Sequence, residues 1–204
     1  MINDTSSPLR LLETRRSCKP RDMIEPGPTA AELETIIGAG MRVPDHGKLA
    51  PWLFHIIDRD HRDGFARLLK EGAFKHPSEL TDLDIAAIEQ FARQAPTLVV
   101  VASLTSRDAK VPIWEQQLSS GAACMQMLNA ATAMGYVGCW LTGWAAYSHK
   151  VIKAFVPDTG MIAGFMFFGS AAKELRERPR PEPEQVIRHW RYDALEPAAG
   201  EKSG

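Results

Sequence analysis

The sequence predicts an α/β or α+β fold in which helices cover both faces of a small sheet. Segments with helical apolar spacing alternate along the chain with short apolar and β-branched runs. Residues 97–104, TLVVVASL, form a continuous apolar run of the kind found in a strand buried on both faces. Residues 112–134 are small or apolar nearly all round the helix that they predict. Such a helix is buried in a core or against a second subunit.

Capping residues and periodicity place the individual elements. Thr29 and Glu32 match a capping box ahead of an apolar helical repeat. Pro112 falls at the start of the long helix, Gly135 follows its end, and Ser148 is positioned to cap a shorter helix. The sequence therefore predicts helices at about 29–41, 61–74, 81–96, 112–134 and 148–155, and strands at about 53–58, 97–104, 136–142 and 161–171.

The C-terminal part has a different composition. After Ala172 the chain is rich in Pro, Arg and Glu and poor in aliphatic residues, so residues 173–204 cannot pack a core of their own. Four large side chains in this part would be poorly placed in free solution: Val186, Ile187, Trp190 and Tyr192. We expect one domain over residues 1–172 and an arm that docks on a partner subunit, frayed from Glu196 onward. A disordered tail is the alternative.

Overall charge and cysteine content exclude several classes of protein. The 204 residues include 24 Lys and Arg against 25 Asp and Glu, a net charge of -1, so no nucleic acid or anionic membrane is expected as a partner. No apolar run reaches membrane-spanning length, and the N-terminus lacks the order of a signal peptide. Cys18, Cys124 and Cys139 are too scattered for a disulfide framework. We expect an unprocessed cytoplasmic protein.

The usual catalytic and metal motifs do not occur in the sequence. It has no GxGxxG after a strand, no P-loop, no GxSxG and no HExxH. The sequence therefore lacks the usual motifs of dinucleotide-fold dehydrogenases, P-loop enzymes, α/β hydrolases and zincins. Asp45 and His46 are adjacent and His55 belongs to a strand, so no metal site is expected. Cys18 lies among cations that favour a thiolate, but a packed cysteine is the simpler interpretation.

One local group of basic residues lies in RRSCK. Arg15, Arg16 and Ser17, with Lys19 close behind, bring guanidinium groups and a hydroxyl together. Guanidinium groups bind phosphate through two parallel hydrogen bonds, so this group predicts a phosphate clamp. Basic residues that interact with a helix dipole at its C-terminus are the alternative.

The loop MRVPDHGKLAPW, residues 41–52, is the second basic group. Arg42, His46 and Lys48 supply cationic or hydrogen-bonding side chains, while two prolines stiffen the loop and Trp52 anchors its exit. A rigid loop with convergent polar groups is typical of a scaffold that holds a ligand.

These motifs occur in a fixed order: RRS, the helix ending AGMRVPDHGKLAPW, the stretch VPIWEQQLSSGAACMQMLNAATAMGYVGCWLTG, and a last strand ending at Gly169. In that order, from about Leu9 to Gly169, the chain resembles the nitroreductase family of FMN-dependent flavoproteins, in particular its short bacterial NAD(P)H nitroreductase branch. The resemblance implies an α+β fold, an α/β/α sandwich whose small mixed sheet is covered by helices on both faces. It also implies a homodimer with FMN at the interface and the C-terminal arm exchanged between subunits.

The resemblance implies cofactor-binding roles for both basic groups. Arg15, Arg16 and Ser17 match the RRS motif and would hold the phosphate and ribityl chain of FMN. Arg42 and His46 match the RxPDH loop of the short branch, which contacts the flavin from the neighbouring subunit.

It also implies contacts to the flavin ring and the nicotinamide donor. Trp140, Leu141 and Thr142 match the strand end that lies against the isoalloxazine ring. Residues 130–135 correspond to a proposed NAD(P)H-binding segment, although their apolar character favours a buried helix.

The implied reaction needs no catalytic side chain, because the flavin carries the chemistry. Hydride passes from NADH or NADPH to FMN and then, in a ping-pong sequence, to a flat electron-poor acceptor such as a nitroaromatic or a quinone. Arg42 or Lys48 near the pyrimidine edge would favour the anionic reduced flavin.

Some positions depart from the family pattern. Many relatives carry Asn and Gln where Lys48 and Ala50 stand, so either Lys48 substitutes for an amide or the loop sits differently. Close relatives have an arginine at the position of Leu141.

Other functions stay open. A flavin-fragmenting or dehalogenating enzyme of the same family would be distinguished by residues 70–112. A flavin-binding or sensing dimer would not oxidise NADH or NADPH, and a purely structural dimer would bind no flavin.

Overall fold

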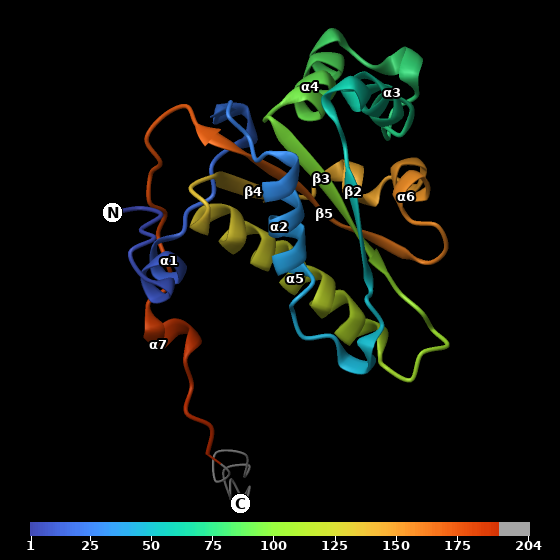
Figure 1. Cartoon of the computed structure of the whole chain (residues 1–204). Coiled ribbons are helices and arrows are strands. Elements are labelled where there is room, and N and C mark those ends of the chain that lie inside the picture. The colour runs from blue at the N-terminus through green and yellow to red at the C-terminus, as the bar shows by residue number, and fades with distance from the viewer. Residues whose placement is uncertain (192–204) are drawn as a thin grey trace, which may run out of the picture.

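The structure, a computed structural model, describes residues 1–191 and forms a sheet with helices on both faces (Figure 1). The strands are β1 (Met23–Ile24), β2 (Trp52–Ile56), β3 (Thr97–Leu104), β4 (Val137–Leu141) and β5 (Gly160–Ala171). The helices are α1 (Pro8–Thr14), α2 (Ala30–Gly40), α3 (Arg62–Glu71), α4 (Asp82–Arg93), α5 (Ile113–Ala133), α6 (His149–Phe155) and α7 (Pro183–Val186). Tyr192, Glu196 and the frayed end that the sequence predicted lie outside the described residues.

The sheet is built on β5. β1, β3 and β4 all pair with β5, and β2 pairs with β3. Val100 lies opposite Phe165, and Trp140 lies opposite Met166. Every pairing in the described residues is antiparallel, which corrects the mixed sheet that the resemblance implied. Two parallel strands need a crossover connection between them. Between β2 and β3 the helices α3 and α4 instead return the chain so that β3 lies antiparallel to β2.

β3 divides the interior into two cores. Leu98 and Val100 pack with α3, α4 and α6, whereas Val99 and Val101 pack with α2 and α5. All four side chains are fully buried. The alternation follows from the two-residue period of a strand. The predicted strand with both faces buried, and the sandwich around it, are confirmed.

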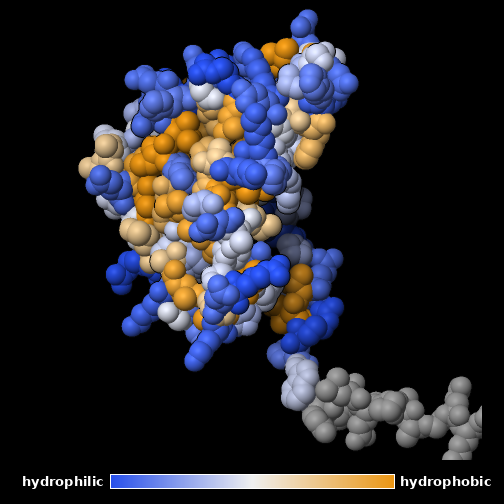
Figure 2. Space-filling view, turned by 90° about the vertical axis from the view of Figure 1, so that its right-hand side faces the viewer, coloured by the Kyte–Doolittle hydropathy of each residue, from blue (hydrophilic) through white to orange (hydrophobic). Residues whose placement is uncertain are grey.

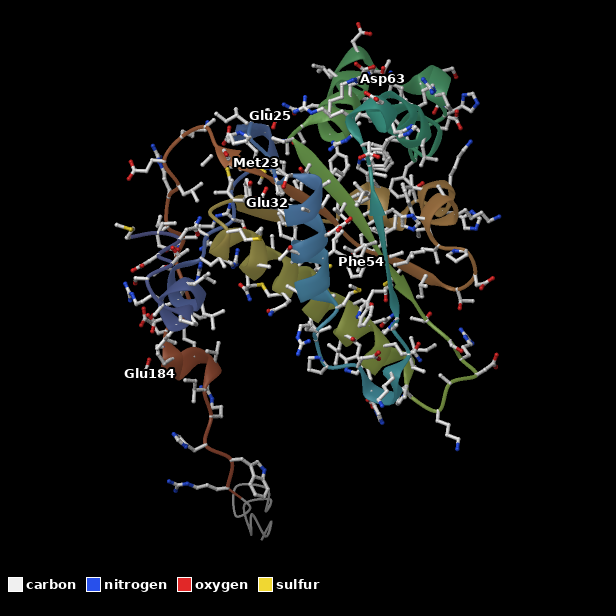
Figure 3. All side chains as sticks on the ribbon, in the orientation of Figure 1. Met23, Glu25, Glu32, Phe54, Asp63 and Glu184 are labelled. Atoms are coloured by element: carbon white, nitrogen blue, oxygen red, sulfur yellow. The ribbon has the colours of Figure 1, made fainter. Side chains whose placement is uncertain are left out.

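The helix starts follow local signals, with one exception. Thr29 and Glu32 form the predicted capping box, and the Glu32 carboxylate, labelled in Figure 3, also accepts a 2.9 Å hydrogen bond from the hydroxyl of Tyr136. Ser148 precedes α6, but its hydroxyl does not cap that helix. It donates instead at 2.6 Å to the carbonyl of Gly72, which would otherwise be an unpaired acceptor at the end of α3.

Apolar side chains remain on the outside. α5 buries one side against the sheet but leaves Trp114 and Leu118 exposed, at 67% and 52%. Apolar residues also gather on the side of the molecule seen in Figure 2. Exposed apolar areas of this kind mark surfaces that another molecule covers.

The C-terminal part leaves the domain after β5 and carries the short helix α7 (Figure 1). Val186, Ile187 and Trp190 are largely exposed there. Within residues 1–191, none of the helices combines the length and the apolar composition that crossing a membrane requires.

Candidate functional site

Arg16, just beyond α1, is a buried arginine. Its main-chain N–H donates to Oδ1 of Asn3 at 2.7 Å, and its Nη1 forms a 2.9 Å ion pair with Oε1 of Glu177. The Nε atom is also buried but has no hydrogen-bond partner in the part of the chain that the structure describes. A buried donor without an acceptor costs free energy that a bound anion would recover.

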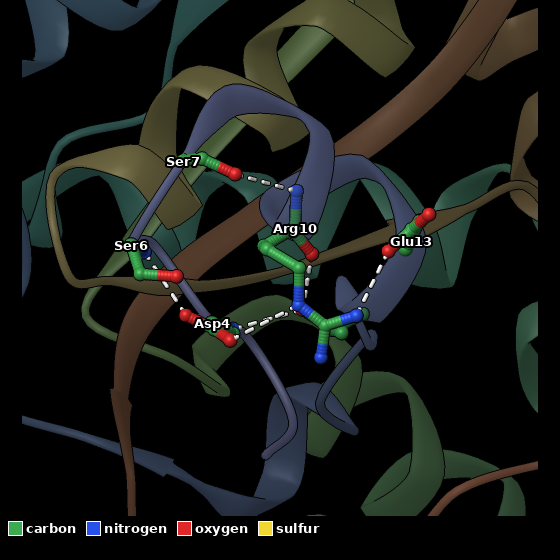
Figure 4. Close-up of polar contacts among 6 residues, drawn as sticks. Asp4, Ser6, Ser7, Arg10 and Glu13 are labelled. Atoms are coloured by element: carbon green, nitrogen blue, oxygen red, sulfur yellow. Dashed lines mark hydrogen bonds and ion pairs between the residues drawn. The ribbon is translucent and has the colours of Figure 1, made fainter.

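Arg10, on α1, shows how a solvent-exposed arginine of the same region is arranged. Its Nε lies 3.3 Å from Asp4 and its Nη1 lies 2.9 Å from Glu13, while Ser7 caps the helix (Figure 4). Two carboxylates thus neutralise Arg10 at the surface. The contrast with Arg16 indicates that Arg16 is the better candidate for holding an external anion.

The segment after β5 supplies one further guanidinium group and one main-chain donor. Arg180 Nη2 lies 3.5 Å from the Glu177 oxygen that Arg16 contacts, and the main-chain N–H of Arg178 donates to the same oxygen at 2.9 Å. Burial lowers the pKa of Arg15, and the charges of Arg16 and Arg180 lower it further. Four arginines, at positions 15, 16, 178 and 180, therefore lie around the carboxylate of Glu177 and are called the basic cluster here. An excess of positive charge of this kind attracts anions.

The sequence interpretation missed Arg178 and Arg180, because it assigned the whole stretch after Ala172 to an arm. The signal was the repeated arginine in RERPR. No local rule could place that repeat beside RRS, which lies about 160 residues earlier in the chain.

A hollow of about 410 Å³ lies next to this cluster. Ser17, Cys18 and Lys19 form one wall, and residues 173–178 form another. Ser17 Oγ also accepts a 3.4 Å hydrogen bond from Nη1 of Arg15. Of the predicted group, Ser17 therefore lines the hollow, and Arg15 and Arg16 lie next to it through their contacts with Ser17 and Glu177.

The hollow continues along the molecule. Lys19 also lines a second hollow of about 380 Å³ that Leu141 borders, and the second hollow shares Ala87 and Phe91 with a third of about 460 Å³. The third contains the edge-to-face aromatic pair Phe74 and Trp144, whose ring centroids are 6.1 Å apart. The first hollow is thus lined mainly by charged side chains of both signs, and the third is lined mainly by apolar and aromatic ones.

Trp140 and Leu141 point to opposite sides of β4. Leu141 packs with the core that contains α4 and borders the second hollow. The indole N–H of Trp140 donates to the carbonyl of Ala163 at 2.9 Å, and its ring covers Gly164. Leu141 therefore shares a hollow with Lys19, which follows the RRS group. Thr142 follows it, half-buried at the end of the strand.

Residues 130–135 form the last turn of α5 and the turn after it. Ala131 and Thr132 are buried, and the Thr132 hydroxyl donates to the carbonyl of Leu128. The segment is thus a helix end that is buried on one side only, since Ala133 and Gly135 are exposed.

The loop between α2 and β2 is held by its own hydrogen bonds. The carboxylate of Asp45 accepts bonds from the main-chain N–H groups of Leu49 and Ala50, at 3.1 and 2.8 Å. Lys48 and Ala50 adopt positive φ angles of 56° and 47°. Positive φ is uncommon for residues with a side chain, so the hydrogen bonds fix an unusual loop shape.

Arg42, His46 and Lys48 are all exposed on this loop. His46 Nδ1 lies 2.6 Å from Oε2 of Glu115, in the first turn of α5. The RRS group lies near the opposite end of α5. There the main-chain N–H of Cys18, which follows RRS, donates to the carbonyl of Gly138 on β4, the strand that follows α5. With 21 residues, α5 is about 30 Å long. One chain therefore does not bring the loop and the RRS group together.

The three cysteines are buried thiols, and the described residues form no metal site. Burial raises the pKa of Cys18, and raises those of Cys124 to about 12 and Cys139 to about 11, so their thiols are protonated near neutral pH. The interpretation of Cys18 as a packed cysteine fits this burial. Over residues 1–191 the structure contains no group of three or more His, Cys, Asp or Glu side chains that could hold a metal.

Comparison with known proteins identifies relatives of the whole domain. The sequence model of the nitroreductase family matches residues 12–170. The protein of Escherichia coli strain K12 named "Putative NAD(P)H nitroreductase YdjA" is 37% identical over 163 residues, which cover 79% of this chain and 87% of that protein.

Solved structures share the fold at lower sequence identity. A nitroreductase-like family protein from Bacillus cereus has a TM-score of 0.77 at 16% identity, covering 91% of this chain and 96% of that one. A structure from Desulfovibrio desulfuricans, solved in complex with FMN, has a TM-score of 0.68 at 20% identity, covering 89% and 96%. The family match and the identity to the Escherichia coli protein confirm the resemblance that the sequence motifs indicated. The chain therefore belongs to the nitroreductase family and is an oxidoreductase enzyme.

Proposed function

We propose that the chain is an FMN-dependent oxidoreductase that takes hydride from NADH or NADPH and reduces a flat, electron-poor acceptor such as a nitroaromatic or a quinone by a ping-pong mechanism. The observation that carries this proposal is the series of hollows that begins at Ser17, next to Arg16 with its unpartnered buried Nε, and passes Lys19 and Leu141 to the aromatic pair. A ligand with a phosphate at one end and a flat ring system at the other matches this order of surfaces.

The residues of the chain fit FMN. Arg15 and Arg16 would bind the phosphate through paired guanidinium hydrogen bonds, and Ser17 would add a hydroxyl for the phosphate or the ribityl chain. Lys19 and Leu141 would flank the ring. The chemistry that bound FMN supplies is hydride transfer, which no side chain of the chain provides.

Arg42, His46 and Lys48 would complete the site from a second copy of the chain. They lie near the other end of α5 from the RRS group, so each copy would offer its loop to the FMN of its neighbour. A cation at the ring stabilises the negative charge of the reduced flavin. We therefore propose a homodimer.

In this homodimer the domain of residues 1–172 contacts its counterpart. Of the arm of residues 173–204, the first part contacts the RRS region of its own chain, and the part that follows docks on the neighbouring subunit. The exposed side chains of Trp114, Leu118 and Ile187 support such contacts, because burying them is favourable. We also propose a cytoplasmic location, since the three cysteines are free thiols.

The visible absorption spectrum of the purified protein tests the proposal. The protein is incubated with FMN, freed of excess cofactor, and treated anaerobically with NADH and then NADPH. Retained yellow colour that bleaches with a nicotinamide donor and returns with a quinone or nitroaromatic supports the proposed reaction. Retained flavin that no donor bleaches would favour a non-catalytic flavin-binding protein, and a colourless protein would contradict FMN binding altogether.

A further inference from the structure

The segment of residues 173–180, here called the C-terminal segment, is tied to the RRS region at both ends. At its start the main-chain N–H of Ala172 bonds the carbonyl of Asp22, and Lys173 forms a 2.9 Å ion pair with the Asp22 carboxylate. Further along, Glu177 contacts Arg16. The C-terminal segment thereby closes one side of the hollow beside Ser17.

The Glu177 carboxylate occupies the position of a bound anion. Its Oε1 atom alone contacts Arg16 Nη1 at 2.9 Å, the main-chain N–H of Arg178 at 2.9 Å and Arg180 Nη2 at 3.5 Å. The N–H of Arg178 and, after it, the Arg16 guanidinium lower the pKa of Glu177, so the carboxylate is charged at neutral pH. This combination of guanidinium and main-chain donors is the one that proteins use for phosphate.

Glu177 neutralises this cluster only in part. It brings one negative charge to the three guanidinium groups of Arg15, Arg16 and Arg180, and Nε of Arg16 stays without an acceptor. A phosphate monoester carries a charge of about −1.5 to −2 at neutral pH and three acceptor oxygens, more than a carboxylate offers. The Glu177 side chain is 57% exposed, so it can turn into solvent when a phosphate takes its place beside the buried Arg16 guanidinium.

We propose that Glu177 is an internal competitor for the phosphate of the cofactor: it holds the guanidinium groups of Arg16 and Arg180 in the unliganded protein, and a phosphate monoester displaces it. The inference rests on the proposed function, since it concerns the phosphate end of the proposed FMN site. Its consequence is that Glu177 lowers the affinity of the site and selects for ligands with more than one negative charge.

Flavin titration of the full-length protein tests this inference. FMN and riboflavin are titrated, with flavin fluorescence as the readout, into the wild type, Glu177→Gln and the control Glu184→Gln. Glu184, labelled in Figure 3, carries the same charge on α7 and has no side-chain ion pair among the described residues. Because an exposed ion pair contributes little, we expect E177Q to tighten FMN binding roughly two- to fivefold. Riboflavin, which has no phosphate, should bind both variants and the wild type alike.

Two results would overturn the proposal. Weaker FMN binding by E177Q would mean that Glu177 holds Arg16 in place for the cofactor. Equal tightening by E177Q and E184Q would mean that only the overall charge matters. If no protein binds FMN, the proposed function fails, and inorganic phosphate monitored by ³¹P NMR then tests Glu177 alone. Tighter phosphate binding by E177Q than by E184Q would support the competition, and equal binding would refute it.

Discussion

The indole N–H of Trp52 donates a 3.1 Å hydrogen bond to the hydroxyl of Ser119, which in turn donates at 2.8 Å to the carbonyl of Pro44. One serine of α5 thus joins both ends of the loop that carries Arg42, His46 and Lys48. The sequence predicted that prolines would stiffen this loop. The structure adds this serine and the Asp45 carboxylate as the groups that hold it.

Ser119→Ala should destabilise the protein by about 1–3 kcal/mol, because it removes the partners of a partly buried indole N–H and of a carbonyl. Urea unfolding measures the change. Ser106→Ala is the control, since the Ser106 contacts involve its main chain only. An equal effect of the two substitutions would mean that the hydrogen bonds of Ser119 do not matter for stability.

Two glycines flank the Trp140 ring and should respond oppositely to alanine. A Cβ at Gly164 would lie 2.1 Å from the indole nitrogen, so Gly164→Ala must displace the ring and should cost about 1–3 kcal/mol. Gly121 lies within α5, and a Cβ there would lie 3.7 Å from the ring, which is an ordinary van der Waals contact. Gly121→Ala should therefore stabilise the helix by up to about 1 kcal/mol. Thermal unfolding of both variants checks this, and comparable losses in the two would disprove it.

Acid should remove the stabilisation that Asp84 provides at the start of α4. The N–H of Thr81, then Lys75 and the Thr81 hydroxyl, lower the pKa of Asp84 from 3.8 to about 2. A lowered carboxyl pKa contributes stability above the unfolded-state value, and that contribution is lost as the pH falls through the folded-state value. The Tm difference between wild type and Asp84→Asn should thus be largest above pH 4, be small near pH 2 and disappear below it.

Asp82→Asn is the matched control for this pH series, because Asp82 carries the same charge in the same helical turn. We expect a smaller Tm change for D82N throughout. A D84N difference that persists unchanged at pH 2 would point to packing rather than charge.

Arg16→Ala should weaken FMN binding by roughly 10- to 100-fold, the range expected for the loss of charge-assisted hydrogen bonds. Arg10→Ala removes an arginine that two carboxylates already neutralise, so it should leave the FMN affinity within about twofold. Flavin fluorescence gives both dissociation constants, and circular dichroism verifies that R16A is folded. Unchanged binding by folded R16A would remove Arg16 from the proposed site.

Mixing two defective variants tests whether one cofactor site is shared between copies. In a heterodimer of Arg16→Ala and Arg42→Ala, one site receives both substitutions and the other receives neither. Random reassociation of equal amounts should therefore restore about one quarter of the wild-type NADH oxidation. Each variant alone should stay defective, and a mixture that gains nothing over the separate variants would contradict a shared site.

Local signals predicted the elements well and their assembly less well. The capping box of Thr29 and Glu32 and the apolar run of β3 are encoded within a few residues, and both formed as expected. Ser148 failed as a cap because its hydroxyl meets a carbonyl from α3, 76 residues away. The antiparallel sheet likewise depends on how helix pairs turn the chain, which periodicity does not encode.

The candidate site shows the same division. RRS and the proline loop were visible as short motifs, whereas Glu177, Arg178 and Arg180 reach the cluster only through tertiary structure. The positions of Trp140 and Leu141 on opposite sides of β4 follow from strand geometry once the strand is known. That Leu141 shares a hollow with Lys19 could not be read from the sequence, because it depends on how distant segments pack.

The basic cluster joins residues far apart in sequence, and this fixes the order in which its parts are made during biosynthesis. Glu177, which contacts Arg16, is synthesised 161 residues later, and Arg180 follows it. A domain can begin to fold from its N-terminal side while synthesis continues. The RRS group is therefore made long before its partners after β5, so an anion that requires both groups binds only after the strands and helices between them have been synthesised.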